Sequence, residues 1–435
     1  MKKIKNMIFL LLVFLSFSFA KELTLEEGLQ LLYSNNYQLK TLESKLTQAK
    51  YKKLETFSTW LPKLQAQIQY TKLSEPQMKI PPQMSMFFGS AFPPTLTSDK
   101  YYTASITASQ LLFSSGKVLS AYKISCLGYE IAKYEYEKTK KDLEIQYKEA
   151  FLKALLAKKV CEVAQKAVEI SSENYKISFD FYEEGRVSYL DYSSAKLNYL
   201  NAEMNLLKLK SGYEIAKESL KNILCVNEDI EPIGEVEEIL KKYDFEIDLR
   251  SLTSNITQLP EVKTLELQKK ILKNNLYITK TEVLPTISFV ANYNWTTVDY
   301  TEPYEKWDDR RTYMVVLNWP IFNGGATFAK YEQAKENLKQ IELAKKLTVS
   351  GLELQLKSLY HTYIQLKESI AIAKENLELA EESYEVARNY YMEGRSSHLE
   401  LLQSELSLSN TKINYYQTLT DYVVTLEKLR KFLND

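Results

Sequence analysis

The chain has 435 residues, and its 56 basic and 56 acidic side chains give a formal charge of zero at pH 7. A protein without net positive charge is not expected to bind nucleic acid, because nucleic acids select basic surfaces. The three cysteines (Cys126, Cys161 and Cys225) fit no zinc or redox spacing, so the sequence indicates neither a metal site nor a cofactor.

Residues 1–20 have the pattern of a signal peptide. Three lysines lie among the first five residues, residues 7–19 are apolar, and Ser18 and Ala20 supply small side chains for cleavage. Removing the three lysines from the 56 basic residues would leave 53 against 56 acidic ones. The alternative, a retained anchor, is disfavoured because the apolar run is short for a membrane span.

The chain contains an internal repeat. The pair Gly185-Arg186 returns as Gly394-Arg395, an offset of 209 residues, and each glycine follows a phenylalanine by 72 residues. A constant spacing predicts long helices, because one inserted residue would rotate everything beyond it by about 100°.

These landmarks, together with the strand and helix patterns below, predict two repeats after the signal peptide. The first repeat covers residues 21–225 and contains a helix, a strand hairpin at about 63–111 and a long helical hairpin at about 117–225. A linker covers residues 226–262. The second repeat covers residues 263–435 and contains a helix, a strand hairpin at about 286–320 and a long helical hairpin at about 326–433.

Four segments alternate polar and apolar residues with period two, which is typical of strands. They are about 9–11 residues long, the length of a tilted membrane-spanning strand. A soluble sheet with one wet face is the alternative that this alternation leaves open. If the strands lie in a membrane, several chains must close one barrel, because unpaired strand edges cannot face lipid.

No proline occurs between residues 95 and 231 or after residue 320, so long helices can run there. Apolar residues in these tracts alternate spacings of three and four, which predicts left-handed coiled-coil seams. The seam of the later tract contains Val349, Leu352, Leu356, Leu359, Tyr363, Leu366, Ile370, Ala373, Leu377, Ala380, Tyr384, Ala387 and Tyr391. The Pro- and Met-rich segment 75–97 is expected to be an irregular loop, with a soft-metal site as the alternative.

The order of these motifs resembles the TolC-like outer-membrane efflux protein family. The resemblance rests on Leu-Pro before a strand, Pro320 to Gly325 after one, and the paired Tyr-x-x-Gly turns, and it covers residues 22–433. It implies a mainly α fold with a small β part: a long antiparallel coiled-coil helical barrel plus four membrane strands per chain, with a trimer closing a 12-stranded β-barrel. It also implies the outer membrane, with a periplasmic helical extension, as the location.

The resemblance further implies an exit duct of a tripartite efflux or type I secretion system, gated at its periplasmic tip. The expected partners are two further copies of the chain in a homotrimer, a periplasmic adaptor, an inner-membrane transporter and outer-membrane lipid. By position in the motifs, the gate residues would be Asp191, Tyr391, Glu400 and Arg395. The second acid of the family's constriction ring falls on Gln403, so a less charged ring is expected.

The turns Gly185-Arg186 and Gly394-Arg395 would dock the adaptor. The family's gate arginine lies one position later, at Ser396, so the partner of Arg395 is not indicated. Two alternatives stay open: Asp191 and Glu400 are also placed to cap helices. Arg186 and Arg395 are expected to contact the adaptor, with solvated turn residues as the alternative.

An enzyme is not expected, because the only two histidines, His361 and His398, belong to no catalytic or metal-binding constellation. The remaining alternative is a soluble periplasmic coiled-coil adaptor or scaffold without a pore.

Overall fold

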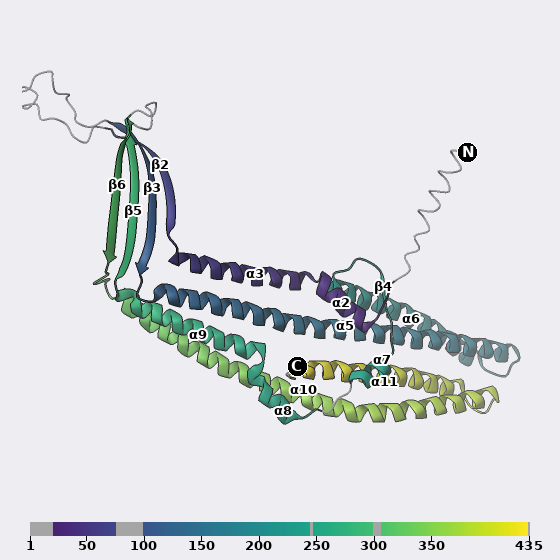
Figure 1. Cartoon of the computed structure of the whole chain (residues 1–435). Coiled ribbons are helices and arrows are strands. Elements are labelled where there is room, and N and C mark those ends of the chain that lie inside the picture. Colours follow the sequence, from purple (N-terminus) through teal and green to yellow (C-terminus); the bar gives the residue numbers. More distant parts are fainter. Residues whose placement is uncertain (1–20, 75–98, 244–246, 299–305, 434–435) are drawn as a thin grey trace, which may run out of the picture. The chain divides into compact units, whose positions relative to one another are not determined.

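The computed structural model describes residues 21–74, 99–243, 247–298 and 306–433 (Figure 1). The predicted signal peptide and the Pro- and Met-rich loop lie outside these residues. Two compact units are present, one formed by Met1–Lys45, Lys133–Thr264 and Lys345–Asp435, and the other by Leu46–Ala132 and Leu265–Ala344. Each unit therefore combines segments of both sequence repeats.

The second unit contains one antiparallel sheet with the strand order β2-β3-β5-β6, which Figure 1 shows side by side. Its strands are β2 (Lys63–Lys72), β3 (Lys100–Phe113), β5 (Thr286–Thr297) and β6 (Asp308–Asn318). These are the four strands that the period-two alternation predicts, so that prediction is confirmed. Strands β3 and β5 come from different repeats and pair with Ala108 opposite Ala291, so the sheet joins the two halves of the sequence.

Strands β2 and β6 are the edges of this sheet. Apolar side chains on both strands face outward: Ile68 on β2 is 85% exposed, and Tyr313 and Val315 on β6 are 70% and 69% exposed. A soluble protein rarely leaves an alternating apolar face of a sheet uncovered, because burial of such a face is what stabilises the sheet.

Two helical hairpins account for almost half of the chain. Helices α5 (Lys117–Glu183) and α10 (Ala326–Met392) each have 67 residues, and they are followed by α6 (Tyr189–Leu224) and α11 (His398–Arg430). The equal lengths confirm the helices that the constant spacing predicts. In the part of the chain described here, no helix combines the length and the apolar character that a membrane span requires.

The predicted seam of α10 is confirmed in the first unit. Seven of its members are buried: Leu352, Leu356, Tyr363, Ala373, Ala380, Tyr384 and Tyr391. All but Ala373 pack in two clusters: one includes Tyr422 and Leu426 of α11, and the other includes Leu401 and Leu408 of α11, with Ile170 and Ile177 of α5 packed against it.

Shorter elements complete the chain. They are β1 (Lys21–Leu23), α2 (Leu25–Asn35), α3 (Tyr37–Phe57), β4 (Ile230–Pro232), α7 (Val236–Tyr243), α8 (Leu249–Asn255) and α9 (Pro260–Lys280), with 3-10 turns at Ser58–Trp60, Ile256–Gln258 and Thr281–Val283. The segment expected to link the repeats thus has structure of its own, and its strand β4 pairs in parallel with β1.

The main core of the first unit surrounds Tyr147 and Phe151 of α5, both fully buried. The Tyr147 hydroxyl donates a hydrogen bond of 3.1 Å to the Leu25 carbonyl, which fixes α2 on α5. A Cβ added to Gly28 would lie 1.8 Å from that hydroxyl, so only glycine permits this approach.

Candidate gate at the turns of the helical hairpins

The two hairpin turns have nearly identical backbones. Gly185 and Gly394 have φ angles of 71° and 70°, the left-handed conformation that glycine adopts without steric cost. In both turns the following arginine donates its backbone N–H, at 2.8 Å, to a carbonyl five residues earlier, that of Phe181 or Tyr390. The turns lie close together, because a Cβ on Gly394 would be 3.9 Å from Nη2 of Arg186.

The helices after the turns begin with hydrogen-bonded caps. Ser188 accepts from the Asp191 backbone N–H at 3.2 Å, and the Asp191 carboxylate accepts from the Ser188 hydroxyl at 2.7 Å and its N–H at 3.2 Å. Ser397 caps α11 by accepting from the Glu400 N–H at 3.4 Å. Within one chain, Asp191 is therefore a capping residue, and Glu400 lies in a first helical turn, where negative charge is favourable.

The two turn arginines also have equivalent environments. Arg186 forms an ion pair with Glu184 at 3.3 Å and lies over the Phe181 ring at 4.0 Å. Arg395 forms an ion pair with Glu393 at 3.1 Å, and its side chain is 65% exposed. Both guanidinium groups are thus accessible to a partner, because exposed pairs of this kind contribute little to stability and separate easily.

Tyr391 and His398 are buried between the hairpins. Their rings lie 5.7 Å apart, and the side chains of Phe181 and Tyr391 are also in contact, at 6.1 Å between ring centroids. The Tyr391 hydroxyl and both His398 nitrogens have no hydrogen-bond partner among the described residues. Burial raises the pKa of Tyr391 and lowers the pKa of His398, and the Asp191 charge opposes the second shift.

The structure therefore brings Asp191, Tyr391 and the two turns into one region but forms no hydrogen bond between Asp191 and Tyr391 within the described chain. Glu400 is exposed, whereas His398 and Leu401 in the same turn of α11 are buried. Sequence reasoning missed His398 as a member of this region, although its spacing of three residues from the buried Leu401 is the signal that would have placed it on the packed face of α11.

The first hairpin carries a row of aromatic side chains that the second lacks. Tyr182 stacks on Tyr192 with ring centroids 5.3 Å apart, and Tyr175 stacks on Tyr199 at 6.0 Å. At the equivalent positions, 209 residues later, the second hairpin has Tyr391, Leu401, Tyr384 and Leu408. The two hairpins thus share a turn but present different side-chain surfaces.

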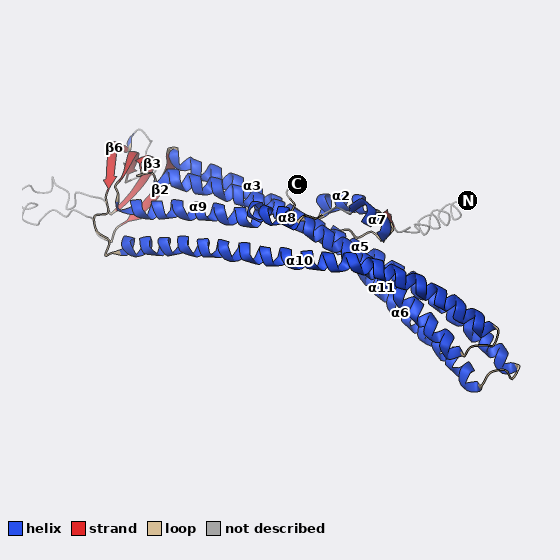
Figure 2. Ribbon diagram, turned by 90° about the horizontal axis from the view of Figure 1, so that it is seen from below, coloured by secondary structure: helices blue, strands red, loops and turns tan. Residues whose placement is uncertain are grey.

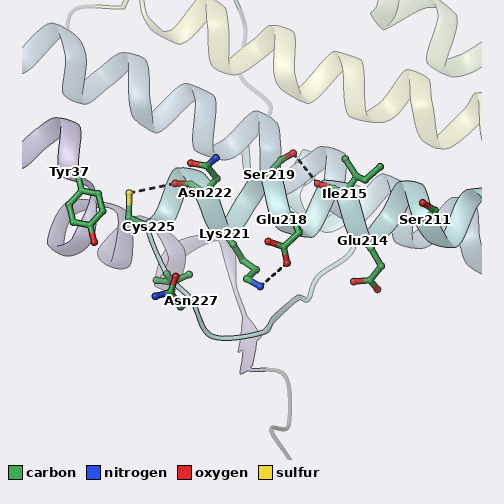
Figure 3. A pocket seen from close by; sticks show the side chains of 11 residues that line it. Tyr37, Ser211, Glu214, Ile215, Glu218, Ser219, Lys221, Asn222, Cys225 and Asn227 are labelled. Atoms are coloured by element: carbon green, nitrogen blue, oxygen red, sulfur yellow. Dashed lines mark hydrogen bonds and ion pairs between the residues drawn. The ribbon is translucent and has the colours of Figure 1, made fainter.

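A surface hollow of about 740 Å³ lies at the end of α6, beside Tyr37 (Figure 3). Several of its polar groups are satisfied locally: Lys221 pairs with Glu218 at 2.7 Å, and the Cys225 thiol donates to the Asn222 carbonyl at 3.5 Å. Among the described residues, no group of three His, Cys, Asp or Glu side chains could hold a metal ion.

Solved structures with a similar fold are outer-membrane channels. The chain superposes on the Campylobacter jejuni CmeC outer membrane channel with a TM-score of 0.79 and 16% identity, covering 94% of this chain and 85% of that one. The outer membrane protein VceC of Vibrio cholerae gives 0.76 and 15%, covering 94% and 95%. The open state of the Neisseria gonorrhoeae MtrE outer membrane channel gives 0.75 and 16%, covering 94% and 88%.

No curated protein matches the sequence. The family model described as outer membrane efflux protein matches residues 28–225 and 256–435, which together make up most of the chain. This match favours a channel over the soluble adaptor or scaffold. The chain is a channel protein of the outer membrane with a periplasmic helical domain, and it belongs to the outer membrane efflux protein family.

Proposed function

We propose that this chain is the exit duct of a tripartite efflux or type I secretion system, and that the duct closes at the Gly185 and Gly394 turns. The observation that carries the proposal is a four-stranded sheet with two open edges on a chain whose helical hairpins end in paired turns. Only further copies of the chain can close such a sheet in a membrane, because an unpaired edge in lipid costs several kcal/mol for each backbone group.

A homotrimer is the assembly we propose, with four strands from each copy in one barrel of twelve. The helices support association with other copies, because α6 and α10 expose apolar stripes that nothing within the described chain covers. The stripe of α6 contains Leu190, Leu197, Leu200, Met204 and Leu207, and that of α10 contains Leu347, Leu354, Ile372, Leu379 and Val386.

In the trimer, Asp191, Tyr391, Glu400 and Arg395 would form the gate. Three copies of the exposed Glu400 around one axis would repel one another and attract cations, which sets the selectivity of a narrow pore. The capping role of Asp191 is compatible with this function, since a carboxylate has more lone pairs than its cap to Ser188 uses.

The exposed turns are the proposed docking site for a periplasmic adaptor, which would connect the duct to an inner-membrane transporter. Gly185, Arg186, Gly394 and Arg395 would be the residues involved. The accessible guanidinium groups and the backbone that only glycine readily adopts both support this assignment.

Single-channel conductance in planar bilayers tests the duct and its gate together. The wild type is expected to show a low, cation-selective conductance. The double substitution Asp191→Ala with Tyr391→Phe should raise that conductance, because it weakens a closing contact whose hydrogen bonds are worth about 1–3 kcal/mol. A protein that never inserts would contradict the duct, whereas an inserted channel with unchanged conductance in the double variant would contradict the gate alone.

A further inference from the structure

Near the turns, the packed face of α11 alternates apolar and ionisable side chains. Its buried positions are His398, Leu401, Glu405 and Leu408, which follow one another at spacings of three and four residues. A helix seam of this kind is normally apolar throughout, because each polar group buried in it costs stability unless it is hydrogen-bonded.

The face of α5 that packs here is also polar. Ser171, Asn174 and Ser178 follow the same spacing and are 1%, 3% and 0% exposed. Asn174 donates a hydrogen bond of 3.2 Å from Nδ2 to Oε2 of Glu405, which joins the first hairpin to the second. The buried Ser178 hydroxyl lies beside the Tyr391 side chain. We use the name polar seam for five side chains: Ser171, Asn174 and Ser178 of α5, and His398 and Glu405 of α11.

Glu405 forms no ion pair within the described residues, and its one hydrogen bond there is the one from Asn174. It is 6% exposed and borders a cavity of about 60 Å³ whose wall includes Ile170 and Leu408. Two lysines also line this cavity, but Lys412 forms its ion pair with Glu381 at 2.9 Å. The other titratable groups near it among the described residues are Lys166 of α5, the neutral phenol of Tyr384 on α10, and the ion pair between Arg388 and Glu173 at 3.2 Å. Burial raises the pKa of Glu405 to about 7.

His398 lies seven residues before Glu405 on α11, and its side chain is a base, whereas that of Glu405 is an acid. The titratable groups that face it are Asp191 of α6 and Tyr391 of α10, and α5 contributes Phe181 and Ser178 beside Tyr391. Neither ring nitrogen has a hydrogen-bond partner within the described residues, so the packed state accommodates the neutral ring.

We propose that His398 and Glu405 are a proton-linked latch: the polar seam closes with both side chains uncharged, and its opening releases a proton from Glu405 and allows His398 to bind one. This inference rests on the proposed function, because it assigns a regulatory role to the same gate. Separation of the hairpins hydrates both side chains and restores their ordinary titration.

The two groups give opposite dependences on pH. Closure raises the pKa of Glu405, so Glu405 stabilises the closed seam fully below its ordinary pKa of 4.5. This stabilisation of the closed seam is lost as the pH rises through about 7. Closure lowers the pKa of His398, so His398 stabilises the closed seam fully above its ordinary pKa of 6.5. This stabilisation is lost as the pH falls below 6.5. The wild-type latch therefore varies less with pH than either group alone.

The labelling rate of a thiol in the seam measures opening without any need for conductance. Ser171→Cys provides the buried thiol. Ser407→Cys provides an exposed thiol, and its rate, measured separately, corrects for the pH dependence of the labelling reaction. Both substitutions are made in a chain whose three native cysteines are replaced by serine. The ratio of the two maleimide rates reports the open fraction.

In the His398→Gln variant, the ratio should rise about tenfold between pH 6 and pH 8, because only Glu405 then titrates. In the Glu405→Gln variant, the ratio should fall as the pH rises from 5.5 to 7.5. The double variant should depend on pH less than either single variant.

His361→Gln and Glu382→Gln are matched controls, since both side chains are exposed on α10 and should leave the wild-type profile unchanged. Asn174→Ala in the His398→Gln background should move the midpoint to higher pH, because it removes the hydrogen bond that favours the charged form of Glu405. Parallel profiles for both single variants would overturn the latch, even if conductance confirms the gated duct.

If Glu405→Gln does not fold, the Asn174→Ala variant still tests the latch. A midpoint that moves to higher pH supports the latch, and an unchanged midpoint means that the Glu405 carboxyl is purely structural.

Discussion

At the scale of single residues, two glycines that the sequence marks by repetition have a clear physical role. Gly185 and Gly394 adopt the left-handed conformation expected of them, and the local motif alone was sufficient to predict it. Gly28 is different, since only the packing of α2 on α5 explains why the position excludes a side chain.

Gly28→Ala is therefore expected to destabilise the protein by about 1–3 kcal/mol, because the buried Tyr147 ring must move to admit a methyl group. A thermal melt of the detergent-solubilised protein measures the effect. Gly212→Ala is the matched control: it lies within α6, no atom of the described residues is within 4 Å of the added Cβ, and it should be neutral or stabilising. Equal melting temperatures for the two variants would contradict this reading of the core.

At the scale of elements, the first and last long helices are joined by buried charge. Lys148 of α5 and Glu427 of α11 form an ion pair at 2.6 Å, with side chains 12% and 6% exposed, and Arg430 also contacts Glu427 at 3.0 Å. The two helices belong to different repeats, so this contact fixes the C-terminal helix against the first hairpin.

Glu427→Ala should cost about 3 kcal/mol, because it removes the carboxylate that compensates buried positive charge. Glu378→Ala, which removes only an exposed pair with Lys374, should cost about 0.5 kcal/mol or less. Chemical denaturation followed by circular dichroism distinguishes the two variants, and a similar loss in both would show that the buried pair has no special weight.

At the scale of the whole molecule, the exposed stripe of α6 has an explanation only in an assembly. Leu197 and Met204 occur at positions that the sequence pattern predicts for a seam, yet they are 60% and 65% exposed in the chain. We expect Leu197→Asp together with Met204→Asp to weaken the homotrimer, because charges would be buried against the neighbouring copy.

Mass measurement of the detergent-solubilised protein tests this expectation. The control Lys196→Asp changes charge at the adjacent exposed position of α6 and should leave the trimer intact. An intact trimer in the double variant would place the contact between copies on another face.

The sequence by itself determined the helices, the strands and the turns, because each depends on interactions within a few residues. Absence of proline, apolar spacing of three and four, period-two alternation and left-handed glycine are all local properties. The motif resemblance also indicated the family, which the comparisons confirm, including that these proteins are channels and not enzymes.

Only the tertiary structure decided which local elements meet. It paired β3 with β5 across the two repeats, bonded the Asp191 carboxylate to Ser188, and placed Asn174 against Glu405. These outcomes depend on contacts between residues far apart in the chain, and on burial, which turns an ordinary glutamate into one with a pKa of about 7. A sequence pattern specifies which face of a helix is packed, but the partner on that face is a property of the folded chain.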